Sequence, residues 1–444
     1  SRRQRQMCIR DRCQNLLVSL ANLAQVAAET VLVELLVGRL VPQTAGIGRH
    51  LVRQNDLAVR RAAELDLEVH QLDVHLQEQL LEHLIDLGRH GVHLVQLLVG
   101  SGALRHGVVG QETCGPGGMA YGLRSIPGVF QVIDDVRKYA PEAWIINYSN
   151  PAAIVAEATR RKYNNYKILN ICDMPVAIML SFAKMLGLEK YNDVDPVYFG
   201  LNHFGWWTHL YDKSGVDRMP ELKEKIMKFG LAASHDKHHS DPSWRHTWEN
   251  FKEILTDFPE YLPNTYLQYY LYAKESAEDM DPNYTRANMV MDGREKDMIE
   301  QAKLIRESGG KKEANLNLFN AFGDFIVDVA CSIAYNNADR YLVIVENKGC
   351  IPQMPYDAMV EVPCYLRKWG PEPVTIGNIP QFQLGMMMQQ VSSEKLIVDA
   401  YFEHSYQKAL EAFTMNKTVP SAKVARKILD KMIEANKGYW PELH

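Results

Sequence analysis

The stretch that decides the fold reads WIINYSNPAAIVAEATRRKYNNYKILNICDMPVAIMLSFAKMLG and runs from Trp144 to Gly187. It holds two short apolar runs, WIINYS and KILNI, and a segment with helical apolar spacing follows each of them. Short strands that alternate with helices are typical of a parallel sheet covered by helices. We therefore predict an α/β fold for this part of the chain.

Polar residues follow both predicted strands. Asn150 comes directly after the first strand, and Cys172 and Asp173 come directly after the second. In an open α/β sheet, the carboxyl ends of the strands line the crevice in which ligands bind. This placement favours a binding or catalytic site at these three residues.

Downstream of this stretch, strand and helix patterns continue. VYFGLNHFGWWTHLYD (197–212) is strand-like and aromatic, FGDFIVDVACSIAYN (322–336) predicts an apolar helix, and YLVIVENKG (341–349) predicts a strand that ends in a turn. From about Gln383, the pattern predicts long helices suited to packing against a neighbouring subunit. We expect this part to form an α+β region after the parallel sheet.

Upstream, the composition changes abruptly. The first aromatic residue is Tyr121 and the first lysine is Lys138. With 9% aromatic residues overall, about ten would be expected in the first 120 positions. Two interpretations stay open: residues 1–104 form an amphipathic helical or disordered appendage, or they are not native coding sequence and were joined on upstream of Leu104.

The bulk properties exclude several classes of partner. A formal charge of -5 argues against a general electrostatic grip on nucleic acid or on an anionic membrane. No uninterrupted apolar run is long enough to span a bilayer, and no secretory leader pattern is present. The odd number of cysteines, without a CxxC pair, indicates a reducing compartment. We expect a cytoplasmic protein with a small-molecule substrate.

Cys172 and His203 are the candidate metal ligands. A soft thiolate and an imidazole together could hold a transition metal and leave open positions for substrate. The alternative is a buried cysteine beside a hydrogen-bonded histidine. Asp173 could act as a general acid, or it could cap a helix that has Pro175 in its first turn. A phenol of the tyrosine-rich stretch YLPNTYLQYYLY (261–272) could serve as a base near a metal, or it could belong to a packed aromatic surface.

Four segments, GVVGQETCGPGGMAYGLRSIPG, NYSNPAAIVAEA, NICDMP and GLNHFGWWT, in this order and spacing resemble glycoside hydrolase family 4. The resemblance runs from about Arg105 to the C-terminus and includes NYTRANMVMDGREKDM. The residues that follow Cys172 resemble the 6-phospho-α-glucosidase branch of the family. The resemblance implies a Rossmann-like domain, of which 105–195 would be the remainder, and a substrate-binding and oligomerisation domain over 196–444.

The family's functional residues fall on matching positions of this chain. The resemblance implies that Cys172 and His203 hold a manganese ion, that Asp173 is the general acid and that Tyr266 is the catalytic base. It further implies two substrate contacts, Asn150 and the phosphate-binding Arg286. A guanidinium suits this task because its fork of donors matches phosphate oxygens.

The implied reaction is the hydrolysis of 6-phospho-α-glucosides, such as maltose 6'-phosphate, with NAD and Mn2+ as cofactors. Family 4 is an exception to hydrolysis by two carboxylates: the sugar is oxidised at carbon 3, loses a proton from carbon 2, expels the aglycone, takes up water and is reduced again. No NAD-binding residue can be assigned here. In GSGALR (100–105), two glycines have the spacing of a dinucleotide fingerprint, but Arg105 occupies the position of its third glycine. We therefore expect this chain to be poorly active or misfolded.

Two other functions stay open from the sequence. An NAD-linked 2-hydroxy acid dehydrogenase would need no metal, whereas a non-catalytic sugar-phosphate binding protein would keep Arg286 and the metal pair without a cofactor. The aglycone, the divalent metal and the linkage (α or β) are not fixed by the residues. The resemblance and the helical C-terminus imply a homodimer or homotetramer.

Overall fold

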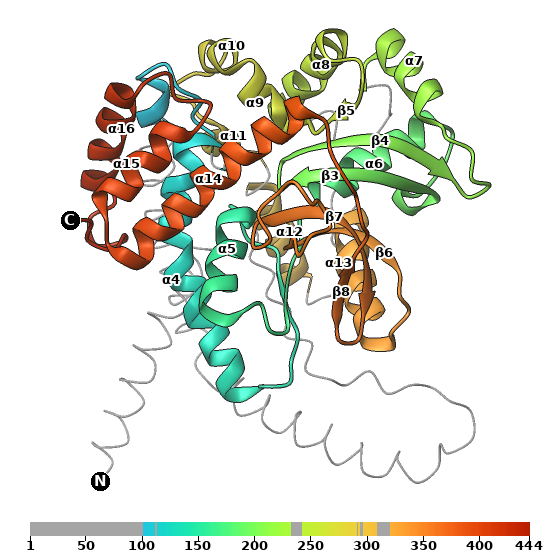
Figure 1. The fold of residues 1–444 in the computed structure, drawn as a ribbon, viewed down its shortest axis with the longest axis horizontal. Helices are drawn as coiled ribbons and strands as arrows, with labels where there is room; N and C mark the ends of the chain where they lie inside the picture. Colours follow the sequence, from blue (N-terminus) through green and yellow to red (C-terminus); the bar gives the residue numbers. More distant parts are fainter. Residues whose placement is uncertain (1–100, 112, 232–241, 291, 294–295, 309–319) are drawn as a thin grey trace.

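The structure is a computed structural model that describes residues 101–111, 113–231, 242–290, 292–293, 296–308 and 320–444 (Figure 1). The prediction of an appendage or foreign segment over residues 1–104 falls almost wholly outside these ranges. Two of the seven cysteines, Cys8 and Cys13, also lie outside them. None of the five cysteines in the described ranges forms a disulfide.

Two strand–helix units lie where the sequence predicts them. β1 (Ile145–Asn147) leads into α5 (Ala152–Tyr163), and β2 (Ile168–Asn170) leads into α6 (Met174–Met185). The two strands are parallel, and Asn147 is level with Asn170. The α/β prediction for this region is therefore confirmed.

These strands belong to a larger mixed sheet. In the described part of the chain its order is β1-β2-β6-β7-β3-β4-β5, with β8 paired to β7, and every pairing other than β1 with β2 is antiparallel. The further strands are β3 (Val194–Leu201), β4 (Phe204–Asp212), β5 (Leu262–Pro263), β6 (Arg340–Glu346), β7 (Met359–Arg367) and β8 (Gly370–Pro373).

The strand-like run 197–212 proves to be a hairpin rather than one strand. β3 and β4 pair from Val194 with Asp212 to Leu201 with Phe204, so that Asn202 and His203 form the whole turn. His203 has a φ of 59°, in the left-handed region that histidine enters more readily than most residues. The predicted ligand therefore projects from a tight turn.

Helices surround the sheet and carry conventional end signals. Asn164 and His404 end α5 and α14 in the left-handed conformation, and the side chains of Ser405 and Ser421 cap the starts of α15 and α16. Besides α5 and α6, the α-helices of the described ranges are α4 (Gly115–Tyr139), α7 (Met219–Phe229), α8 (Pro242–Asp257), α9 (Gln268–Leu271), α10 (Ala273–Glu278), α11 (Arg286–Val290), α12 (Lys296–Glu307), α13 (Asn320–Tyr335), α14 (Gln381–Glu403), α15 (Tyr406–Met415) and α16 (Ala422–Ala435).

Two large hydrophobic cores result from this arrangement. One gathers side chains of α6, β3, β4, β7 and α13, and the other gathers side chains of α4, α5 and α14–α16. In Figure 1 the helices α14–α16 and α4 lie together on one side, and the β3–β4 hairpin with α6–α8 lies on the other. Helix α14 connects the two sides, because it contacts α4 and α5 as well as β3.

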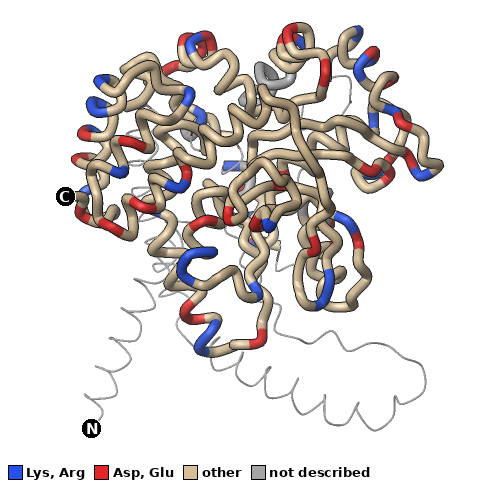
Figure 2. The backbone as a smooth tube through the Cα atoms, viewed as in Figure 1, with Lys and Arg blue, Asp and Glu red and all other residues tan. Residues whose placement is uncertain are grey.

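Positively and negatively charged residues both occur along many of the helices (Figure 2). Within the described ranges, no helix has the length and apolar character needed to cross a membrane.

Candidate active site

The site begins where β1 and β2 end side by side. The Asn147 side-chain amide donates to Asn170 Oδ1 (2.7 Å), and the Ser149 hydroxyl donates to Asn147 Oδ1 (2.6 Å). These buried bonds fix the chain just before Asn150 and Cys172. Asn150 Oδ1 is buried and accepts no hydrogen bond from the described residues, so it offers an acceptor to a ligand.

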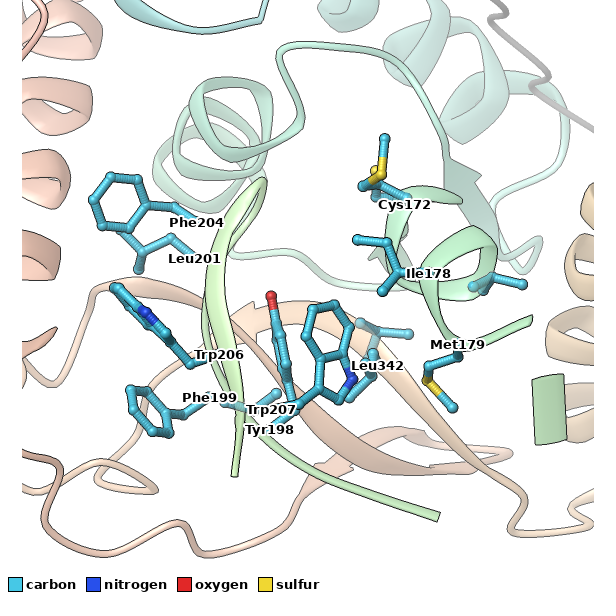
Figure 3. Close-up of a cluster of buried hydrophobic side chains, with 14 of the residues drawn as sticks. Cys172, Ile178, Met179, Tyr198, Phe199, Leu201, Phe204, Trp206, Trp207 and Leu342 are labelled. Atoms are coloured by element: carbon cyan, nitrogen blue, oxygen red, sulfur yellow. The ribbon is translucent and has the colours of Figure 1, made fainter. Parts of the chain in front are cut away.

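The two predicted metal ligands are brought together. Cys172 Sγ lies 3.2 Å from His203 Nε2, and both residues are buried. Metal bonds of about 2.3 Å to sulfur and about 2.1 Å to nitrogen place two ligands of one ion roughly 3.5 Å apart. The observed separation therefore fits a shared cation as well as a direct hydrogen bond. Figure 3 shows that Cys172 belongs to the same buried cluster as Tyr198 and Trp207 of the hairpin.

The protein also orients the imidazole. His203 Nδ1 lies 3.2 Å from Thr113 Oγ1, and the Thr113 hydroxyl donates to Gln111 Oε1 (2.8 Å). Because the threonine proton points to Gln111, its oxygen accepts from the Nδ1–H group of His203. This tautomer leaves the lone pair of Nε2 directed toward Cys172.

The ionisation of both ligands is set by burial. Burial lowers the pKa of His203 to about 3, so that the imidazole is neutral and can bind a metal at neutral pH. Burial also raises the pKa of the Cys172 thiol well above its usual value, with the nearby Asp173 and Glu361 acting in the same direction. A cation that binds the sulfur must therefore displace its proton.

Tyr266 lies directly against the candidate ligand. Its ring stacks on the His203 ring with centroids 4.2 Å apart and an angle of 13° between the planes. It belongs to a 3-10 turn (Thr265–Leu267) that the Asn264 side chain caps by accepting from the Tyr266 amide. One tyrosine of the aromatic stretch is thus placed at the site.

Asp173 adjoins the ligands through the chain itself. It is the N-cap residue of α6, but its side chain accepts no cap hydrogen bond within that helix, which is described throughout. Cys172 Sγ lies 3.8 Å from Asp173 Oδ1. The carboxylate oxygen thus adjoins the sulfur ligand, and the capping alternative is wrong for this side chain.

Arg286 is the first residue of α11 and is half-buried. Its contact with a substrate phosphate stays a prediction.

Thr113 and Gln111 are site residues that the sequence did not reveal. Both belong to the segment GVVGQETCGPGGM, but the 90 positions between Thr113 and His203 carry no signal that joins them.

The donor set suits a catalytic rather than a structural cation. Within the residues that the structure describes, no group of three or more His, Cys, Asp or Glu side chains is placed to hold a metal ion. A pair of protein ligands leaves several coordination positions for substrate oxygens. Thiolate and imidazole are ligands for first-row transition metals.

Comparisons with known proteins agree with this geometry. Residues 91–188 match the family model described as family 4 glycosyl hydrolase, and residues 198–419 match that of the family 4 glycosyl hydrolase C-terminal domain. The chain belongs to glycosyl hydrolase family 4. The match begins at residue 91, whereas the start of the resemblance was predicted at about Arg105. The predicted start was too late because the stretch GVHLVQLLVGSGAL (91–104) holds no motif residue that could be assigned from the sequence alone.

Individual relatives are more specific. A maltose-6'-phosphate glucosidase of Fusobacterium mortiferum is 53% identical over 341 residues, which is 77% of this chain and 77% of the relative. A 6-phospho-α-glucosidase from gut microorganisms, solved in complex with NAD and Mn2+, is 50% identical with a TM-score of 0.75 over 79% of each chain. A second such enzyme, solved with NAD and glucose-6-phosphate, is 47% identical with a TM-score of 0.76 over 79% of this chain and 80% of the other.

Family membership decides between two of the open functions. The chain is similar to glycosidases that were solved with a metal, and so the metal-free dehydrogenase interpretation is set aside. The neighbours also support the expected Rossmann-like fold.

Proposed function

We propose that this family 4 chain hydrolyses 6-phospho-α-glucosides, such as maltose 6'-phosphate, with NAD and Mn2+. The observation that carries the proposal is the 3.2 Å approach of Cys172 Sγ to His203 Nε2, with the Tyr266 ring stacked on the histidine. The relatives named for this activity support the substrate class.

Cys172 and His203 would hold the metal. Bound NAD supplies reversible hydride removal at carbon 3 of the sugar, and bound Mn2+ supplies polarisation of the oxygens on carbons 2 and 3. Tyr266 then takes the acidified proton from carbon 2 with its phenolic oxygen. Asp173 gives a proton to the glycosidic oxygen as the bond breaks. The stack on His203 would hold the Tyr266 phenol next to the metal ligands, where it could reach the proton on carbon 2.

Two residues bind the sugar phosphate and hydroxyls in this proposal. Arg286 binds the 6-phosphate, and the buried Asn150 Oδ1 accepts a hydrogen bond from a sugar hydroxyl. Binding energy at the phosphate positions carbon 2 against Tyr266. Residues that bind NAD are not assigned.

The protein is proposed to act in the cytoplasm as a homodimer or homotetramer. Large apolar side chains exposed on α13 and on the β7–β8 hairpin, including Val327 (52% exposed) and Trp369 (69% exposed), support an association surface. Light scattering coupled to gel filtration measures the mass. A monomer at all concentrations would contradict the oligomer.

Hydrolysis of p-nitrophenyl 6-phospho-α-glucoside tests the activity. We compare the chain with a chimera in which residues 1–90 are replaced by the N-terminal segment of the Fusobacterium mortiferum relative. The chimera should release nitrophenol only when NAD+ and Mn2+ are both present. The chain itself should cleave the substrate at least about 100-fold more slowly than the chimera. This factor corresponds to a loss of about 3 kcal/mol of transition-state stabilisation, and the absence of a cofactor site should cost at least that much.

Two outcomes would contradict the proposal. Cleavage that persists after chelation of all divalent metal would exclude the metal role of Cys172 and His203. A folded chimera that binds glucose 6-phosphate in a calorimeter, yet cleaves nothing with both cofactors, would favour the non-catalytic binding protein instead.

A further inference from the structure

A carboxylate that the proposed reaction does not use lies behind the metal pair. Glu361 is in the middle of β7, level with Gly200 of β3 on one side and Ile344 of β6 on the other. It is fully buried, with 0% of its surface exposed. A buried carboxyl is costly unless it is hydrogen-bonded, so its contacts indicate what it stabilises.

Both carboxylate oxygens bind the β3–β4 hairpin. Glu361 Oε2 accepts from the Tyr198 hydroxyl (2.8 Å), and Oε1 accepts from the side-chain amide of Asn202 (3.2 Å). Tyr198 is on β3, whereas Asn202 is in the turn that carries His203. Glu361 therefore ties the body of the hairpin and its turn to the central strand β7.

Two glycines make room for this connection. A Cβ atom on Gly205 would lie 2.2 Å from the Tyr198 hydroxyl, and one on Gly200 would lie 2.3 Å from Gly205 Cα. Real Cβ atoms do not approach so closely. The Tyr198 side chain thus crosses a part of the hairpin that has no side chains of its own.

Asn202 connects Glu361 to the turn that holds a metal ligand. Through the backbone it adjoins His203, whose left-handed conformation depends on the shape of the turn. His203 in turn places Nε2 3.2 Å from Cys172 Sγ. The amide of Asn202 therefore links Glu361 to the turn that sets the position of the imidazole relative to the sulfur.

We propose that Glu361 and Asn202 are a positioning pair, which fixes the hairpin turn so that Cys172 and His203 bind the same cation. The proposal rests on the metal site of the proposed function. Groups that hydrogen-bond to metal ligands orient them, and their loss typically weakens metal binding by about 10- to 100-fold. Neither Glu361 nor Asn202 needs to touch the substrate.

Mn2+ binding by the full chain tests this proposal without any activity assay. The signal of free Mn2+ in electron paramagnetic resonance gives the affinity of the parent chain and of each variant. We expect Asn202→Ala and Glu361→Leu to bind Mn2+ about 10- to 100-fold more weakly than the parent. Glu361→Gln keeps an acceptor oxygen for Asn202, so it should retain affinity within about tenfold.

The controls separate positioning from general stability. Glu394→Gln alters another buried carboxyl, which is bonded to Gln390 on α14, and should leave Mn2+ affinity unchanged. Near-ultraviolet circular dichroism confirms that each variant is folded. Co2+ in place of Mn2+ adds a spectroscopic test, because the thiolate-to-cobalt absorption band should weaken in Asn202→Ala and persist in Glu394→Gln.

The outcomes distinguish the two proposals. If the parent binds Mn2+ and Cys172→Ser does not, but folded Asn202→Ala binds it as tightly as the parent, the positioning pair is wrong and the metal site stands. Asn202→Ala decides this even if Glu361→Leu fails to fold. If the parent binds no Mn2+ at all, the proposed function fails, and the positioning role fails with it.

Discussion

The parallel and antiparallel halves of the sheet deliver their functional groups in different ways. In the parallel half, Asn150 and Cys172 lie in the short segments just after the neighbouring strands β1 and β2, three and two residues past their last residues. In the antiparallel half, His203 projects from a hairpin turn and Glu361 lies inside a central strand. The first arrangement depends only on where a strand ends, whereas the second depends on the register of β3, β4 and β7. Substitutions that disturb this register should therefore affect the site even when they lie far from the ligands.

The largest effect is expected from the loss of Cys172, the metal ligand that the parallel half of the sheet supplies. Cys172→Ser should weaken Mn2+ binding by roughly 1000-fold, or about 4 kcal/mol, because a neutral, weakly coordinating hydroxyl replaces an anionic thiolate, which is one of two protein ligands. Isothermal titration measures the affinity. Cys364→Ser, an equally buried cysteine on β7, is the control and should bind Mn2+ like the parent. Similar losses in both variants would mean that the effect is structural.

Gly205→Ala tests the packing of the antiparallel half. The new methyl group would overlap the Tyr198 hydroxyl and break its bond to Glu361, so the free energy of unfolding should fall by about 3 kcal/mol. Urea denaturation measures this change. Gly385→Ala on the exposed side of α14 meets no atom and should instead stabilise the chain by up to about 1 kcal/mol. Equal stability of the two variants would contradict the close packing of the hairpin.

The pH dependence of stability tests the helix that contacts both halves, since α14 packs against α5 and β3. Burial raises the pKa of Glu394 from 4.5 to about 8. Between these values the folded chain keeps a proton that the unfolded chain has released, so stability falls as pH rises. Between pH 5 and pH 7, Glu394→Gln should gain about 2–3 kcal/mol relative to the parent.

Urea denaturation at the two pH values measures this difference. Glu411→Gln is a matched control, because Glu411 accepts from a glutamine four residues earlier, as Glu394 does, but is exposed. It should follow the parent at both pH values. A constant difference between Glu394→Gln and the parent would show that Glu394 ionises alike in the folded and unfolded chain.

The smallest effect is expected where a residue before α4 supports the hairpin turn. Thr113→Val removes the oxygen that accepts from His203 Nδ1 and should weaken Mn2+ binding by about tenfold. Thr159→Val removes a buried hydroxyl of α5 that binds Ala156 and Asn165, and it should leave Mn2+ affinity unchanged. Unchanged affinity in Thr113→Val would mean that the tautomer of His203 is held by other means.

The same contrast explains what could be predicted from the sequence. Strand ends and helix spacing are local, and so α5 lies over the predicted residues and Cys172 lies where the strand pattern placed it. The residue types already suggested His203, and the resemblance singled out Tyr266 within its aromatic stretch; the structure brings the two rings into contact. Arg286 and Asn150 remain predictions as substrate contacts.

Other parts of the site depend on contacts that no local pattern encodes. Residues 359–367 gave no strand prediction, although β7 is central to the sheet and carries Glu361. The bond from His203 to Thr113 joins residues 90 positions apart, and that from Asn202 to Glu361 joins residues 159 positions apart. Such pairs are set by strand order and register, which follow only from the folded chain.

The two-residue turn at Asn202 and His203 also limits how the chain can vary in length. Successive side chains of a strand face opposite sides of the sheet, so a single inserted codon here would carry the imidazole away from the sulfur. The opposite end of β4, where Lys213 and Gly215 are exposed, bears no such restriction. In a library of random insertions screened for metal retention, tolerated insertions should therefore accumulate at Lys213–Gly215 and be missing at this corner.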